Sequence, residues 1–225
     1  MSCFKSLLSF AFVAVMAFPL CFSSGAAKAD VFVWQNPDKG VSVSFPDRWA
    51  VMSNLNSEEI LRIAGPVKVG AVEHPQCRIR VQDDNRFKMH PVSHAGDIQA
   101  AVFGRDYWDE YVLGFKDAQI NGFADGGSLG RGYASYADIT FDSYEHPKMI
   151  RRGIAFVSFY NSQAHVIECS VERDAYMKWV PVFMNIVKSV DFDPVSMPFK
   201  HGAYRDFYEG RSIIEGYKPV DDYIF

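Results

Sequence analysis

The sequence predicts an α+β protein, in which an antiparallel sheet packs against α-helices, and it predicts that this protein is exported. Three observations lead to this prediction. Short strands of alternating polarity follow one another across short turns, two segments repeat their apolar residues at helical spacing, and the first thirty residues have the pattern of a signal peptide. Strands joined by short loops pair antiparallel, and amphipathic helices must cover an apolar surface. We therefore expect a sandwich domain (αβα) over residues 30–192.

The composition is that of a globular domain. Of the 225 residues, 48% are hydrophobic and 15% aromatic, and 23 basic residues face 27 acidic ones, for a formal charge of −4. These values exclude a disordered, collagenous or coiled-coil chain. Without a basic surplus, nucleic acid is not expected as a partner.

The N-terminal segment, residues 1–29, has the features of a cleavable signal peptide. Lys5 precedes an apolar run from Leu7 to Leu20, and small residues lead up to Asp30. Those 14 residues would form about 21 Å of helix, which is short of the ~30 Å hydrocarbon core of a bilayer. We expect cleavage before Asp30 and a periplasmic or secreted protein, the alternative being an uncleaved anchor. Cleavage would remove two lysines and no acid, which changes the formal charge to −6, and no later stretch is apolar enough to span a membrane.

Cleavage would also leave two cysteines, Cys77 and Cys169. Alternation along each strand places both sulfur atoms on apolar faces, whereas the arginines beside Cys77 point to the opposite face. A pair of cysteines in an exported chain predicts one disulfide, and two separate buried thiols are the alternative.

The first half of the domain begins with two strands, residues 31–34 and 41–45, joined by a turn that contains Pro37 and Gly40. Residues 57–63 fit either a short capped helix or a strand. A strand around Cys77 follows.

In the second half of the domain, the spacing of the apolar residues changes from that of a strand to that of a helix. Apolar residues recur at helical spacing from about 97 to 115, where Gly104 is expected to weaken one helix without ending it. The glycine-rich run 126–132 is expected to be a hairpin connection that leads into a strand over 133–141. The remaining elements are a hairpin of strands 152–160 and 164–172, and a final helix capped by Asp174 that runs to about 188, with Pro181 marking a kink or a late start.

A family resemblance accompanies this order of elements. The run from Gly40 to Trp49, a strand of alternating apolar residues followed by Phe-Pro and then Trp, resembles the opening of the PsbP-like αβα-sandwich superfamily. The closing helix that runs into Val190 and Phe192 is similar as well. The resemblance covers roughly residues 31–192 and implies the sandwich fold. It also implies a binding or assembly protein rather than an enzyme, and it supplies no active-site residues.

The chain offers few residues for chemistry, and we predict no catalytic residue and no cofactor. His165 and Cys169 share a strand face but lie about 13 Å apart at ~3.3 Å per residue, which is too far for a catalytic pair. The glycine-rich run lacks the lysine of a phosphate-binding loop. His74, His90 and His94 are the candidate metal ligands, although solvated loop histidines are the simpler interpretation, and Pro91 opposes a helix that would pair the last two.

The C-terminal extension, residues 193–225, has little periodicity but is rich in aromatic residues. Such side chains are usually buried against something. Either the extension wraps over its own domain or it docks on a partner protein. We predict an exported, non-catalytic module that binds or helps to assemble another envelope protein, with a small extracytoplasmic enzyme or metal- or ligand-binding protein as the alternative. The candidate partner-binding residues are Phe199, Tyr204, Phe207, Tyr208, Tyr217, Tyr223 and Phe225.

Overall fold

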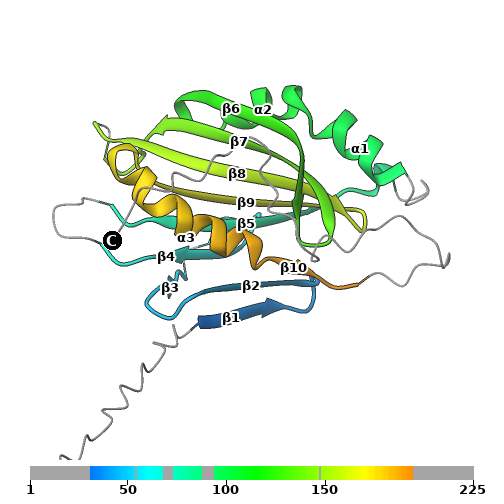
Figure 1. Ribbon diagram of the computed structural model, residues 1–225, viewed down its shortest axis with the longest axis horizontal. Coiled ribbons are helices and arrows are strands. Elements are labelled where there is room, and N and C mark those ends of the chain that lie inside the picture. The colour runs from blue at the N-terminus through cyan, green and yellow to red at the C-terminus, as the bar shows by residue number, and fades with distance from the viewer. Residues whose placement is uncertain (1–30, 54, 68–72, 88–93, 147, 195–225) are drawn as a thin grey trace, which may run out of the picture.

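The computed structural model describes residues 31–53, 55–67, 73–87, 94–146 and 148–194. The predicted signal peptide, the aromatic side chains of the C-terminal extension and His90 lie outside these ranges. Within them the chain is an α+β sandwich of antiparallel sheets and helices, as the sequence predicts (Figure 1).

The larger sheet has seven strands in the order β3-β4-β5-β9-β8-β7-β6. In chain order these strands are β3 (Ala50–Val51), β4 (Glu59–Ala64), β5 (Gln76–Asp83), β6 (Lys116–Leu129), β7 (Gly132–Asp142), β8 (Ile150–Tyr160) and β9 (Gln163–Glu172). The smaller sheet pairs β1 (Val31–Asn36) with β2 (Val41–Pro46) and β2 with β10 (Asp191–Phe192).

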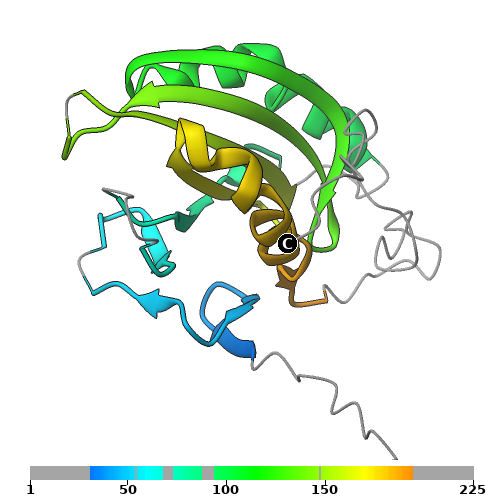
Figure 2. The same ribbon diagram turned by 60° about the vertical axis from the view of Figure 1, so that its left-hand side comes forward.

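The helices lie on both faces of the larger sheet. The helix α3 (Tyr176–Lys188) covers one face, and α1 (Ala95–Val102) and α2 (Arg105–Val112) cover part of the other (Figures 1 and 2). Among the described residues, no helix has the length and apolar character that crossing a membrane would require.

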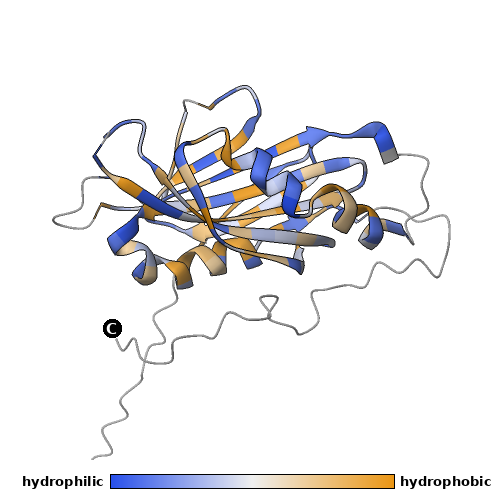
Figure 3. Cartoon of the chain, turned by 90° about the horizontal axis from the view of Figure 1, so that it is seen from above, coloured by the Kyte–Doolittle hydropathy of each residue, from blue (hydrophilic) through white to orange (hydrophobic). Residues whose placement is uncertain are grey.

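Hydrophobic and hydrophilic residues alternate along much of the sheet (Figure 3), whereas β8 and β9 are buried almost throughout, so the middle of the sheet packs on both faces. The core beneath α3 joins both sheets, because Val43 and Phe45 of β2 pack there with Phe183 of the helix. Trp49, which ends the family-like pattern, contacts the rings of Trp179 and Phe183 at centroid distances of 6.0 and 6.4 Å. This arrangement explains why a tryptophan closely follows the second strand.

The second core lies between α1, α2 and strands β7 to β9. Gln99 of α1 is 2% exposed, accepts a hydrogen bond from the Phe159 amide at 2.7 Å, and donates one to the Val157 carbonyl at 3.1 Å. Trp108 of α2 is fully buried and donates to Ser135 Oγ of β7 at 3.0 Å. These buried bonds hold both helices over one half of the sheet.

The predicted helix over residues 97–115 is wrong in one respect, because it is two helices. Helix α1 ends at Val102 and Gly104 is the N-cap of α2, with an extended ψ of −155°. A Cβ atom at Gly104 would lie 2.7 Å from the Ala100 carbonyl oxygen, so the close turn requires glycine.

The glycine-rich run also differs from the prediction. Gly126 and Gly127 belong to the edge strand β6, and the turn to β7 lies at Gly130 and Arg131. Gly126 has a φ of +111° where the register shifts between Asp125 and Gly127, so it forms a bulge.

Two ambiguous segments are resolved by packing. Residues 59–64 form the strand β4, because Leu61 and Ile63 enter the core beneath α3. The final helix begins at Tyr176 after a short 3-10 turn that contains Asp174, and its N-cap is Ala175 rather than the predicted Asp174. Pro181 lies inside this helix, on its exposed side.

Candidate functional site

The candidate site lies on the face of the larger sheet that carries α1 and α2, where these helices leave strands β4 and β5 uncovered. The strand β5 shows how this face arises. Cys77, Ile79 and Val81 point into the core beneath α3, so Arg78 and Arg80 project from the other face. A polar cavity of about 520 Å³ opens there. This volume falls within the range of ligand pockets.

Among the described residues, four arginines line the cavity, one from each of β4 and β8 and two from β5. They are Arg62, Arg78, Arg80 and Arg151. Arg62 and Arg78 are directly paired across the strands, a register that would place two like charges together. Glu59 lies between them, with its carboxylate 2.6 Å from Arg62 and 3.7 Å from Arg78, so the repulsion is offset.

Glu168 of β9 is the central carboxylate of the cavity and is 3% exposed. It accepts hydrogen bonds from the Arg78 guanidinium at 2.8 Å and from the Tyr111 hydroxyl of α2 at 2.6 Å. Burial by itself would raise the pKa of Glu168, but the charge of Arg78 and these hydrogen bonds outweigh it and lower the pKa. Burial and the adjacent Glu168 charge raise the pKa of Tyr111 well above its ordinary value. The carboxylate therefore stays ionised and the phenol stays protonated.

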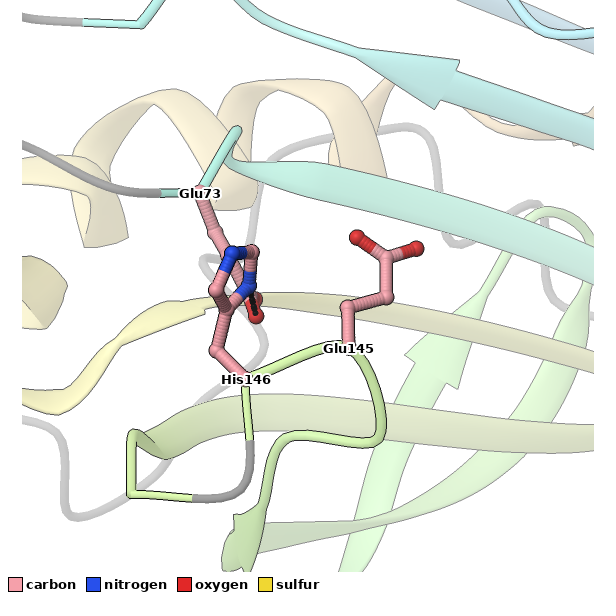
Figure 4. Close-up of side chains that lie close together, drawn as sticks. All are labelled: Glu73, Glu145 and His146. Carbon is pink, nitrogen blue, oxygen red and sulfur yellow. Dashed lines mark hydrogen bonds and ion pairs between the residues drawn. The ribbon is translucent and has the colours of Figure 1, made fainter.

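A second charged cluster closes the other end of the cavity. Glu73 accepts hydrogen bonds from Arg151, Ser143 and His146, the last at 2.9 Å (Figure 4). Burial alone would raise the pKa of Glu73, but the Ser143 and His146 hydrogen bonds and the Arg151 charge lower it. Glu73 is thus held as an anion by its neighbours.

This cluster contains the residue types of a serine–histidine–carboxylate triad, but its bonding is different. The Ser143 hydroxyl donates to Glu73 directly, and Nδ1 of His146 contacts the same carboxylate oxygen. A nucleophilic serine must instead be hydrogen-bonded to the histidine that removes its proton. The observed arrangement is therefore an ion-pair network around one carboxylate.

Glu73, Glu145 and His146 are also the group of potential metal ligands that the described residues bring together, with ligand atoms within 4.8 Å of one another (Figure 4). Arg151 already neutralises Glu73. A guanidinium bound to the same carboxylate opposes a second cation, so this donor set suits a metal ion poorly.

The histidines proposed as metal ligands are not brought together by the described structure. His74 lies beside the cavity-lining Glu73, with Nδ1 2.7 Å from the Gly65 carbonyl oxygen. His94 precedes α1 and lies 3.8 Å from Asp97. Neither belongs to the cluster above, and His90 lies outside the described residues, so a three-histidine site stays a prediction.

The two cysteines are joined by a disulfide, as the sequence predicts. Cys77 and Cys169 occupy directly opposite positions of β5 and β9, with Cα atoms 4.0 Å apart, and both are buried. The bond ties the two strands that carry Arg78 and Glu168, which face the cavity from the next position along each strand. It therefore holds the two halves of this ion pair in register.

Sequence reasoning missed the cavity residues. The arginines on β5 have the pattern of an ordinary solvent-exposed face, and Arg151 and Glu73 belong to segments with no distinguishing motif. The available signal was Glu168, a carboxylate between the apolar Ile167 and the cysteine Cys169, since a buried carboxylate requires a partner.

The class of protein that these observations define is an antiparallel α+β sandwich with a charged cavity on a half-covered sheet. Comparison of the sequence with models of known protein families and with curated proteins finds no match. Solved structures are similar in the path of the chain. Cyanobacterial PsbP (CyanoP) from Synechocystis is 10% identical, with a TM-score of 0.48 over 78% of this chain and 99% of that one.

LpqN, involved in cell envelope biogenesis of Mycobacterium tuberculosis, is 12% identical, with a TM-score of 0.49 over 73% of this chain and 91% of that one. The Ran-binding protein Mog1p of Saccharomyces cerevisiae is 6% identical, with a TM-score of 0.41 over 73% and 96%. At 6–12% identity and TM-scores of 0.41–0.49, the likeness to each of these structures is in the path of the chain alone.

Proposed function

We propose that this protein is an exported, non-catalytic module that binds another envelope protein through the charged cavity. The observation that carries the proposal is the state of the cavity's ionisable groups. Glu73 and Glu168 have lowered pKa values and Tyr111 has a raised one. Proton transfer near neutral pH needs the opposite shifts, whereas fixed charges suit recognition of a complementary surface.

Export is supported by two features of the chain. Residues 1–29 have the pattern of a cleavable signal peptide, and the described domain carries a disulfide between Cys77 and Cys169. Disulfides persist in oxidising compartments such as the periplasm and the extracellular space. We therefore propose a periplasmic or secreted location for the mature chain from residue 30.

The C-terminal extension is proposed as a second contact with the partner. Its aromatic residues, from Phe199 to Phe225, would supply apolar area that the charged cavity lacks. If the extension instead wraps over its own domain, deleting residues 199–225 will lower the free energy of unfolding. If it docks on a partner, the deletion will weaken binding and leave the domain's stability unchanged.

The volume of the cavity favours one alternative, a carrier of a small molecule. A space of about 520 Å³ is sufficient for a ligand of that class without a protein partner. Native mass spectrometry of the protein purified from its own envelope distinguishes the two functions, because a carrier retains a bound small molecule of constant mass.

Site-specific photo-crosslinking tests the proposal directly. Tyr144 lies on the rim of the cavity and is 66% exposed, and Met177 on α3 lies on the opposite face and is 38% exposed. We expect p-benzoylphenylalanine in place of Tyr144 to yield one crosslinked envelope protein, and the same residue in place of Met177 to yield none. The absence of an adduct at Tyr144, or identical adducts at both positions, refutes the proposal.

A further inference from the structure

One guanidinium of the cavity differs from the other three. Arg62, Arg78 and Arg151 each form an ion pair with a buried glutamate. Arg80 forms none among the described residues, and its Nη2 atom is buried without a hydrogen-bond acceptor there. A buried donor that lacks an acceptor costs about 1–3 kcal/mol, and an acceptor supplied by a ligand would offset that cost.

Arg80 is held in position by its surroundings. Its guanidinium carbon lies 5.0 Å from the centre of the Tyr111 ring, a cation–π contact that orients the group without neutralising it. The Tyr111 hydroxyl is in turn bound to Glu168. Arg80, Tyr111 and Gly114 also line a neighbouring cavity of about 830 Å³, so the guanidinium stands where two open spaces meet.

The charges of the cavity favour a ligand with a single negative charge. Glu59, Glu73 and Glu168 pair with the three other arginines, whereas Arg80 forms no ion pair among the described residues and acts on Glu168 only through its charge, which helps to lower the pKa of that carboxyl. The rim residue Glu145 is exposed, so water screens its charge. A group with two negative charges would face repulsion from the ionised Glu168. This carboxylate lies on β9, directly opposite Arg78 of β5.

Part of the remaining lining is aromatic. Phe115 and Phe141 lie against each other at a centroid distance of 4.6 Å, and Tyr144 closes the rim with its hydroxyl donating to the Gly114 carbonyl at 2.8 Å. These side chains could cover the apolar part of a ligand.

We propose that Arg80 binds the carboxylate of a ligand whose apolar group lies against Phe115, Phe141 and Tyr144. A carboxylate matches the planar, two-pronged donor geometry of a guanidinium and carries one charge. The carboxylate can come from a free aryl or acyl acid or from the C-terminus of a bound protein, since both present the same chemistry. The inference rests on the proposed function only in its use of the same cavity.

Isothermal titration of the full-length mature protein tests this inference with matched probes. We expect phenylacetate to bind, and its neutral analogue phenylacetamide and inorganic phosphate to bind at least tenfold more weakly. The tripeptide acetyl-Ala-Ala-Phe with a free carboxyl group identifies the source of the carboxylate, and the same peptide with a C-terminal amide is its neutral control. Tighter binding of the free-acid peptide than of phenylacetate indicates a protein C-terminus, and the reverse order indicates a small acid.

Variants place the binding at Arg80. We expect Arg80→Gln to weaken phenylacetate binding at least tenfold, and Arg80→Lys to weaken it less because the charge remains. Arg105→Gln is the control, since Arg105 is an exposed residue paired with Asp109 on α2. Circular dichroism verifies that each variant is folded, and the comparison of carboxylate with amide in the wild-type protein requires no variant.

Three results would overturn the inference. They are equal binding of phenylacetate and phenylacetamide, tighter binding of phosphate, and unchanged phenylacetate binding in the folded Arg80→Gln protein. Failure of the proposed function is a separate result. Carboxylate binding at Arg80 together with no crosslinked partner at Tyr144 would uphold the inference and refute partner binding.

Discussion

His165 is expected to make the stability of this protein depend strongly on pH between 6.5 and 4. The imidazole is 2% exposed, stacks on the Phe192 ring at a centroid distance of 4.1 Å, and lies 6.5 Å from the Tyr160 ring. Burial lowers its pKa from 6.5 to about 4, because the charged form is poorly solvated there. The backbone of Tyr160 and the charge of Asp83 partly oppose this shift, and the charge of Lys39 adds to it.

The sign of the effect follows from the two pKa values. Below pH 6.5 the unfolded chain gains a proton at His165, whereas the folded protein stays neutral until the pH approaches 4. The stabilising contribution of the neutral ring is therefore complete above pH 6.5 and decreases as the pH falls toward 4. At about 1.36 kcal/mol per pKa unit, the loss is about 2 kcal/mol at pH 5 and about 3 kcal/mol at pH 4.

Urea unfolding, followed by tryptophan fluorescence at pH 7.5 and 5.0, measures the contribution of His165 to the free energy of unfolding. Other groups also titrate in the range, so the comparison is between wild-type protein and His165→Phe, which cannot gain the proton. We expect the wild-type protein to lose about 2 kcal/mol more than the variant between these pH values. The control is His94→Gln, because the His94 side chain is 60% exposed, and it should lose as much as the wild-type protein. Equal losses in His165→Phe and wild-type protein would refute the reasoning.

Two further predictions concern the pair of strands that carries the cavity. Replacing both Cys77 and Cys169 with alanine removes a crosslink between residues 92 positions apart, and denaturant titration should show a loss of about 4–5 kcal/mol in the free energy of unfolding. An unchanged unfolding midpoint would contradict this. Glu168→Gln leaves the guanidinium of Arg78 without its carboxylate partner and should cost about 3–5 kcal/mol by the same titration. Asp109→Asn, which breaks an exposed ion pair on α2, should cost at most about 1 kcal/mol, and an equal cost for both variants would refute the special role of the buried pair.

The fold class was predictable because it depends on patterns within single segments. Alternation along residues 41–45 and 164–172, and helical spacing in residues 174–188, are local properties of the chain, and each of these segments forms the predicted type of element. The errors occurred where local preference and tertiary packing disagree. The strand β6 contains Asn, Asp and several glycines, residues that disfavour strands, yet it is held along its length by pairing with β7.

The candidate site was less predictable than the fold, because it depends on register. Arg62 and Arg78 have ordinary places on the polar faces of their strands, and their relation to the buried Glu168 appears only when β4, β5 and β9 pair. Glu73 and Arg151 are 78 residues apart in the chain and meet across the cavity. No periodicity within one segment contains such information.

The sequence by itself determined the class of this protein. The alternation along its strands and the helical spacing of its apolar residues indicate an α+β domain, because these patterns lie within single segments of the chain, and the pattern of residues 1–29 predicts export. Only the tertiary structure decided which strands α1 and α2 cover, and therefore which charged side chains of the sheet remain uncovered. Buried charges must be paired or bound, and among the described residues glutamates pair with Arg62, Arg78 and Arg151 but not with Arg80.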